Sequence, residues 1–259
     1  MKTRIGVLSL GMLVTLLPME MVSADDNKTL SYHLTSYFRA SRAVVTKNKS
    51  LIVTPKGVLK GMTPAEYAEK FIGKTNKRYK RVTSDKFDTS DPVKAHLVES
   101  IRMTIEKAVK GQFDGDFLYS PDTYFKEGAK KYDGKFLPAR FAVEVMNTFS
   151  ARNNGKIVLK LTAPSALLVK KSNAPDDWEN RVIETIFKRA DYEKGTPFSE
   201  VVLVKGKKAF RQIIPEYYNK KCMGCHGGEA NQDGINIHQK DVVGTKGQLG
   251  GAISVMIFE

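Results

Sequence analysis

Cysteine is scarce in this chain, since its 259 residues include only two. Both cysteines lie within one five-residue stretch, Cys222-Met223-Gly224-Cys225-His226. A zinc knuckle would need a further Cys/His pair at regular spacing, and no second cysteine pair exists. We therefore expect the chemistry of this chain to centre on this stretch.

Long hydrophobic runs are also few. The one candidate, Ile5 to Leu17, follows Lys2 and Arg4 and precedes the small residues Val22-Ser23-Ala24. This pattern is typical of a secretory signal, and the run is shorter than the roughly 20 residues of a membrane span. We expect residues 1–24 to be a cleaved signal peptide, the mature protein to reach the periplasm, and no stable membrane span to remain. An uncleaved membrane anchor is the alternative.

Acidic residues are outnumbered, because 42 Lys and Arg against 28 Asp and Glu give a formal net charge of +14. Most of the excess is scattered lysine, with clusters at Lys77-Arg78-Tyr79-Lys80-Arg81 and Lys205-Gly206-Lys207-Lys208. Such clusters can meet an acidic redox partner or an anionic membrane surface, and a solvated basic face is the simpler alternative. No nucleic-acid-binding motif is found, so no nucleic-acid partner is predicted.

The stretch from Cys222 to His226 has the spacing by which c-type haem is attached. Each thiol can form a thioether with one vinyl group of the porphyrin, and the next side chain then lies under the iron as its imidazole ligand. A thioredoxin-like redox pair would begin a helix after a strand, whereas Gly227-Gly228 stops a helix quickly here. The motif predicts one covalent haem c on Cys222 and Cys225, with His226 bound to iron. A structural disulfide is the alternative.

The first part of the chain has the three- and four-residue spacing of amphipathic helices. Two of the predicted starts combine a capping side chain with a proline at the first helical position. A loop region with one short helix near Asp122 is predicted between Gly111 and Pro138. The predicted helices are Asn27 to Ser50, Thr63 to about Lys74, Ser90 to about Gly111, and Pro138 to Ala151.

The periodicity changes after the turn Asn153-Asn154-Gly155, where short runs rich in branched residues begin. A capped helix is predicted to follow Asn173-Ala174-Pro175-Asp176-Asp177-Trp178-Glu179. These elements predict an α+β fold with an antiparallel sheet, in which residues 25–135 form a mainly helical portion and residues 136–259 a haem domain packed against it. The predicted strands are Lys156 to Ala163, Ser165 to Lys170, Phe198 to Val204, Lys208 to Ile214, and Gly251 to Phe258.

Four motifs follow one another in the second half of the chain: Asn173-Ala174-Pro175-Asp176-Asp177-Trp178-Glu179, Phe210-Arg211-Gln212-Ile213-Ile214-Pro215, Cys222-Met223-Gly224-Cys225-His226-Gly227 and Gly250-Gly251-Ala252-Ile253-Ser254-Val255. In this order they resemble a family of exported single-haem domains, long catalogued as a domain of unknown function, with a PAS-like fold. Leu137-Pro138-Ala139-Arg140-Phe141 and Arg39-Ala40-Ser41-Arg42-Ala43-Val44-Val45 resemble its helical portion. The resemblance covers most of the mature chain and implies a PAS-like antiparallel sheet with a mainly helical N-terminal portion.

The resemblance also implies thioether positions at Cys222 and Cys225 and a proximal ligand at His226. Some members use a cysteine from a helix before the first strand as the distal ligand, and this chain has none there. Met146 falls at about that place, and a thioether ligand raises the reduction potential relative to a second histidine. An ordinary core methionine is the alternative for Met146. The other candidates for the distal position are His33, His96, His238 and an open site.

Three functions follow from a haem site of this kind. A six-coordinate iron suits single-electron transfer, whereas ligand exchange at the distal site suits a haem-based redox or gas sensor. A peroxidase-type enzyme would need a distal acid/base pair, which the sequence does not offer, so no catalytic residue is predicted. A non-haem binding domain with a Cys222-Cys225 disulfide is the remaining alternative. The expected partner is a redox or signalling protein, and the long N-terminal helix can support a homodimer.

Overall fold

The computed structural model describes residues 23–53, 61–110, 138–227 and 242–259. Most of the predicted signal peptide, the predicted short helix near Asp122, the boundary predicted between residues 135 and 136, and His238 lie outside these ranges. Within them, no helix combines the length and hydrophobicity needed to cross a bilayer.

All four predicted long helices are present: α1 (Ala24–Val53), α2 (Pro64–Thr83), α3 (Pro92–Val109) and α4 (Pro138–Arg152). Thr63 caps α2 in a capping box with Glu66, as predicted. The predicted end of α2 at Lys74 is wrong, because Thr75 and Tyr79 continue its buried face by another turn and more.

Four antiparallel strands form one sheet in the order β1-β4-β3-β2. The strands are β1 (Ile157–Thr162), β2 (Phe198–Val204), β3 (Lys207–Tyr217) and β4 (Leu249–Phe258). Lys205 and Gly206 both have positive φ angles, which is the backbone of a two-residue turn between β2 and β3. The predicted hairpin, and the α+β class with a mainly helical N-terminal portion and an antiparallel sheet, are therefore confirmed.

The strand predicted from Ser165 to Lys170 is wrong, because this segment begins with the single 3-10 turn η1 (Ser165–Leu167). The Leu167 N–H donates to the Pro164 carbonyl at 2.8 Å and closes the turn. The adjacent side chains of Leu167 and Leu168 are both buried, which a turn permits and a strand with one solvent face does not. A second such turn, η2 (Lys171–Asn173), follows.

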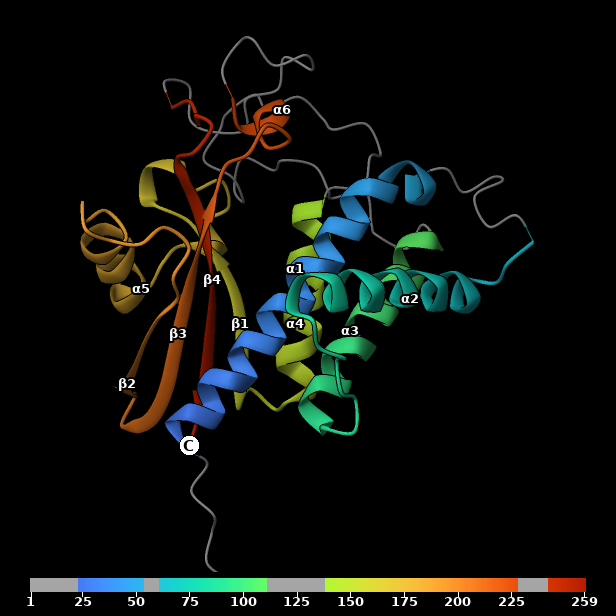
Figure 1. The fold of residues 1–259 in the computed structure, drawn as a ribbon, viewed down its shortest axis with the longest axis horizontal. Coiled ribbons are helices and arrows are strands. Elements are labelled where there is room, and N and C mark those ends of the chain that lie inside the picture. The colour runs from blue at the N-terminus through green and yellow to red at the C-terminus, as the bar shows by residue number, and fades with distance from the viewer. Residues whose placement is uncertain (1–22, 54–60, 111–137, 228–241) are drawn as a thin grey trace, which may run out of the picture.

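The sheet lies between two helical layers (Figure 1). Helices α1 to α4 cover one face, and their apolar side chains share a core cluster with Leu159, Phe210 and Val255 of the sheet. The short helix α5 (Asp177–Arg181) and the π-helical turn η3 (Val182–Ile186) cover the other face in a second cluster. The helical N-terminal portion and the sheet therefore share one hydrophobic core.

Candidate functional site

The cysteine motif forms the short helix α6 (Met223–His226), which follows β3 at the end of the sheet opposite the C-terminus (Figure 1). The His226 backbone N–H donates to the Cys222 carbonyl at 2.9 Å. One helical turn therefore joins the first cysteine of the motif to its histidine. Cys222 is a half-buried free thiol, and the side chain of Cys225 lies outside the described part of the structure.

Gly227 ends this turn. Its N–H donates to the Met223 carbonyl at 3.0 Å, and its backbone then becomes extended. A Cβ at position 227 would lie 2.7 Å from the Met223 carbonyl oxygen, so this turn requires glycine after the histidine. The predicted interruption of the helix just after the motif is confirmed.

Tyr218 contacts the His226 ring, and no motif in the sequence predicts this contact. The two rings are stacked, with centroids 4.7 Å apart and planes inclined by 29°. The Tyr218 hydroxyl oxygen lies 3.1 Å from Nδ1 of His226. Burial, with a smaller effect of Cys222, raises the pKa of the Tyr218 phenol further above physiological pH, at which a phenol is already neutral. One ring nitrogen of the predicted iron ligand is thus engaged by a buried, uncharged group.

The backbone around Tyr218 fixes the position of its ring. The pairing of β3 with β4 shifts register between Glu216 and Tyr217, because Gly250 of β4 has no partner there, and irregularities of this kind re-aim the side chains that follow. The Tyr218 N–H donates to the Gln248 carbonyl at 2.9 Å, and the Gly247 N–H donates to the Tyr218 carbonyl at 2.8 Å. The loop before β4 is therefore tied to the segment that leads into α6.

Two glycines leave room for the Tyr218 ring. A Cβ at Gly244 would lie 2.6 Å from Cε2 of Tyr218, and a Cβ at Gly250 would lie 2.2 Å from Cε1 on the opposite edge of the ring. Gly244 also donates its N–H to the His226 carbonyl at 2.7 Å. Side chains at these positions would displace the tyrosine, so these two glycines are part of the site.

Comparison with known proteins identifies the family of this chain. A family model described as Tll0287-like (Tll0287) matches residues 31–257, which include nearly all the described elements. This chain belongs to the Tll0287-like family. No curated protein and no solved structure matches it. The prediction that the chain belongs to a catalogued domain family is confirmed, and haem binding and the PAS-like fold stay predictions.

Two motifs of this Tll0287-like chain, Asn173 to Glu179 and Phe210 to Pro215, contact each other on the face of the sheet that α5 covers. Arg211 of β3 is buried and contacts Asp176 at 2.8 Å and Glu179 at 3.3 Å. Its guanidinium carbon lies 4.3 Å from the centre of the Trp178 ring. Glu179 is also buried and pairs with Lys160 at 2.6 Å. The two motifs are thus joined by a network of charges in which Arg211 and Glu179 are buried.

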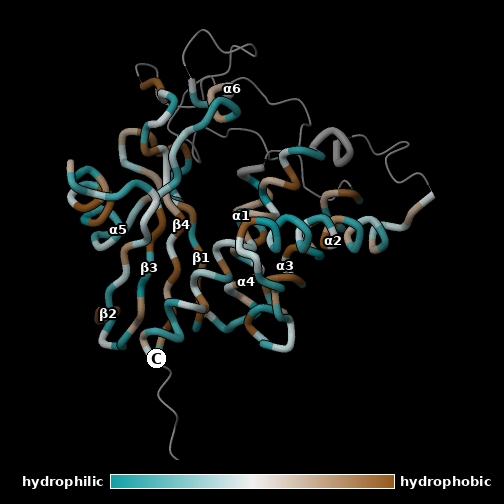
Figure 2. Tube along the Cα trace, viewed as in Figure 1, coloured by the Kyte–Doolittle hydropathy of each residue, from teal (hydrophilic) through white to brown (hydrophobic). Residues whose placement is uncertain are grey.

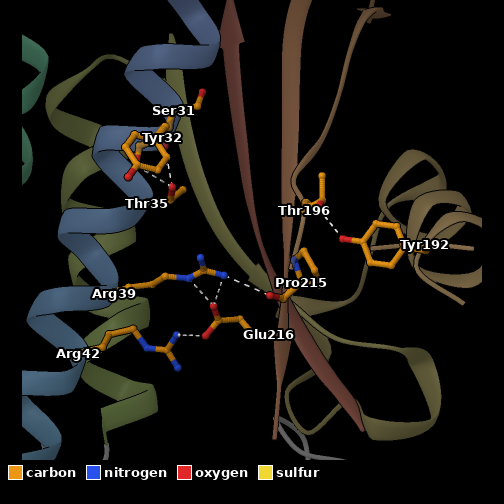
Figure 3. Close-up of polar contacts among 9 residues, drawn as sticks. All are labelled: Ser31, Tyr32, Thr35, Arg39, Arg42, Tyr192, Thr196, Pro215 and Glu216. Atoms are coloured by element: carbon orange, nitrogen blue, oxygen red, sulfur yellow. Dashed lines mark hydrogen bonds and ion pairs between the residues drawn. The ribbon is translucent and has the colours of Figure 1, made fainter. Parts of the chain in front are cut away.

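Helix α1 is tied to the end of β3 by ion pairs (Figure 3). Glu216 accepts hydrogen bonds from Arg39 Nε at 2.6 Å and from Arg42 Nη1 at 3.2 Å. Arg39 Nη2 also donates to the Pro215 carbonyl at 3.1 Å. Since Glu216 precedes Tyr218 by two residues, these contacts connect α1 to the strand end that carries the site.

We expect Glu216→Gln to lower the free energy of unfolding by about 1 kcal/mol or less, because half-exposed ion pairs contribute little and are screened by salt. Urea unfolding at low and high salt measures this effect, which should shrink as salt is added. Glu184→Gln, which breaks a surface pair with Lys188 within one helical segment, serves as the control. A loss of several kcal/mol at both salt concentrations would contradict this account.

Three of the candidate distal ligands, Met146, His33 and His96, lie in the helical layer of the Tll0287-like fold. Met146 is 3% exposed in the core cluster that the helices share with the sheet. Burial lowers the pKa of His33, whose Nδ1 lies 2.5 Å from the Tyr79 hydroxyl. Nδ1 of His96 lies 2.9 Å from the side-chain oxygen of Asn153. Each histidine thus has a polar partner at Nδ1, as His226 does, and this contact is equally compatible with a packing residue and with an iron ligand. Among the described residues, no group of three or more His, Cys, Asp or Glu is placed to hold a metal ion.

The basic cluster Lys77-Arg78-Tyr79-Lys80-Arg81 lies in the second half of α2, which Figure 2 shows in hydrophilic colours. Tyr79 is buried, whereas Lys77, Lys80 and Arg81 are exposed. Periodicity explains this division, because Tyr79 falls on the apolar face of the helix and the three cations fall off it. The exposed side of α2 is therefore positively charged.

Proposed function

We propose that this protein is an exported monohaem c-type cytochrome that carries one covalent haem c. Cys222 and Cys225 would form the thioethers, and His226 would bind the iron through Nε2. The main support for haem attachment is that Cys222 and His226 lie on one helical turn, where Nδ1 of the imidazole contacts the Tyr218 hydroxyl. Metal-bound histidines usually have such a partner at the second ring nitrogen.

The bound haem would supply a one-electron change at iron, and the residues of the chain would decide how that change is used. We propose single-electron transfer or redox and gas sensing as the activity. A fixed sixth ligand suits electron transfer, and Met146 is our proposed ligand for that role. The contacts of Arg39 and Arg42 with Glu216 favour a sensor, because they link the strand end beside the site to the long helix α1.

We also propose that the protein is exported and that it docks an acidic partner protein. The residues before α1 support export to the periplasm, the compartment in which such motifs acquire haem. The exposed cations of α2 support docking of an acidic redox or signalling partner. Pairing of two chains through α1 stays a prediction.

We expect Met146→Leu to keep covalent haem and to cost less than about 1.5 kcal/mol of unfolding free energy, since leucine fills nearly the same volume. The variant keeps the packing of this position but lacks the sulfur atom, so a change in the absorption spectrum reports ligation and a change in stability reports packing. The absorption spectrum of the oxidised protein, including the methionine-to-iron charge-transfer band, and urea unfolding measure the two effects. A spectrum unchanged from the parent would contradict the proposal that Met146 binds the iron and would leave it a core residue.

A further inference from the structure

Tyr218 contacts the predicted iron ligand in two ways at once. Its ring is stacked on His226, and its hydroxyl oxygen lies 3.1 Å from Nδ1. Stacking limits the tilt of the imidazole, and the polar contact limits its rotation about the bond to Cβ. Together they define the direction in which Nε2 points.

The tyrosine can serve this purpose because it is itself fixed. Its side chain is 8% exposed, and its backbone N–H and carbonyl both pair with the loop before β4. Gly244 and Gly250 border the two edges of its ring so closely that neither position has room for a Cβ. The loop that carries Gly244 also bonds the His226 carbonyl, so ring and backbone of the histidine are positioned by the same unit.

We propose that Tyr218 is the positioning residue of His226: its phenol oxygen accepts a hydrogen bond from Nδ1–H and so presents the lone pair of Nε2 to the iron. This inference rests on the proposed haem function. A neutral imidazole carries its proton on only one nitrogen, and the hydrogen bond made by that nitrogen selects the tautomer. An acceptor at Nδ1–H also makes the ligand more basic, which stabilises the oxidised iron.

The first test is the reduction potential of the haem-loaded Tyr218→Phe protein. Phenylalanine keeps the stacked ring and removes only the hydroxyl, so we expect covalent haem to be retained and the potential to shift to a more positive value. Tyr192→Phe is the control, because it removes a phenol that bonds the Thr196 carbonyl on the α5 side of the sheet. An unchanged potential in Tyr218→Phe, or an equal shift in Tyr192→Phe, would overturn the inference.

The second test does not need haem. In the haem-free full chain, at a pH where the imidazole is neutral, the ¹⁵N chemical shifts of His226 report which nitrogen carries the proton. We expect the Nδ1–H tautomer in the parent and a shift toward Nε2–H in Tyr218→Phe. The Nε2–H tautomer in both proteins would overturn the inference. If the expected tautomer change occurs in a chain that never acquires haem, the positioning role of Tyr218 stands and the proposed cytochrome function fails.

Discussion

The double variant Cys222→Ala/Cys225→Ala is expected to lose covalent haem completely. The porphyrin can be joined to this chain only by thioethers, and the sequence contains no other cysteine. Haem staining after denaturing electrophoresis and the intact mass of the protein measure the loss. The fold should be kept, because the two residues lie at a four-residue helix beyond the end of the sheet and Cys222 is in neither core cluster.

Met223→Ala is the matched control for this experiment. Position 223 is on the same helix, and the attachment signature leaves the residue there free to vary. We expect the control to stain like the parent. Haem that stays bound to the double variant after denaturation would refute attachment through the two cysteines.

The second large effect is expected from Arg211→Ala, which should lower the free energy of unfolding by about 3 kcal/mol. The variant removes one of the two cations that pair with the buried Glu179 carboxylate, which keeps Lys160 and the Asp176 N–H, and it removes the stacking of the guanidinium on Trp178. Removal of one partner from a buried ion pair costs more than the pair contributes, because the remaining charge is left without its partner. Urea unfolding monitored by circular dichroism measures the change.

Arg189→Ala provides the comparison, since Arg189 pairs with Asp191 where the two side chains are 58% and 67% exposed. We expect this control to change stability by no more than about 0.5 kcal/mol. Equal effects of Arg211→Ala and Arg189→Ala would show that the network on the α5 face does not stabilise the fold.

The same network predicts a dependence of stability on pH. Burial alone would raise the pKa of Asp176, but hydrogen bonds from Arg211 and from the Glu179 N–H outweigh burial, so its pKa in the folded protein is lowered. The stabilisation is present above the unfolded value of about 4 and is lost as pH falls through the folded pKa. In Arg211→Ala, unfolding free energy should depend less on pH in this acid range, and an unaltered slope would contradict the assignment.

The helices and most strands could be predicted because their signals are local. Thr63 with Glu66 and Asp91 with Pro92 mark helix starts within a few residues, and Lys205-Gly206 marks the turn of the hairpin. The segment after Pro164 was not predicted correctly. Its hydrophobic residues are as compatible with a short strand as with a turn. The turn forms because tertiary packing buries both Leu167 and Leu168.

The candidate site could be predicted only in part, because only part of it is contiguous in the sequence. The spacing of Cys222, Cys225 and His226 identifies the motif, but the contact between Tyr218 and His226 depends on the register shift between the end of β3 and β4. It depends also on glycines before and within β4, and no local pattern links Gly244 or Gly250 to a tyrosine far earlier in the chain. For Met146, burial is expected of a core residue and of an iron ligand alike, so its packing does not distinguish the two roles.

The central claim is that this chain carries one covalent, six-coordinate haem c. The most direct test is the absorption spectrum of the full chain, exported in a host with c-type haem maturation and recorded oxidised, reduced and reduced with carbon monoxide. We predict the low-spin spectrum of a covalent, six-coordinate c-type haem in both oxidation states, and slow or absent carbon monoxide binding. Ready carbon monoxide binding would move the function from electron transfer to gas sensing or catalysis. A protein without haem, with Cys222 and Cys225 joined in a disulfide, would contradict the claim.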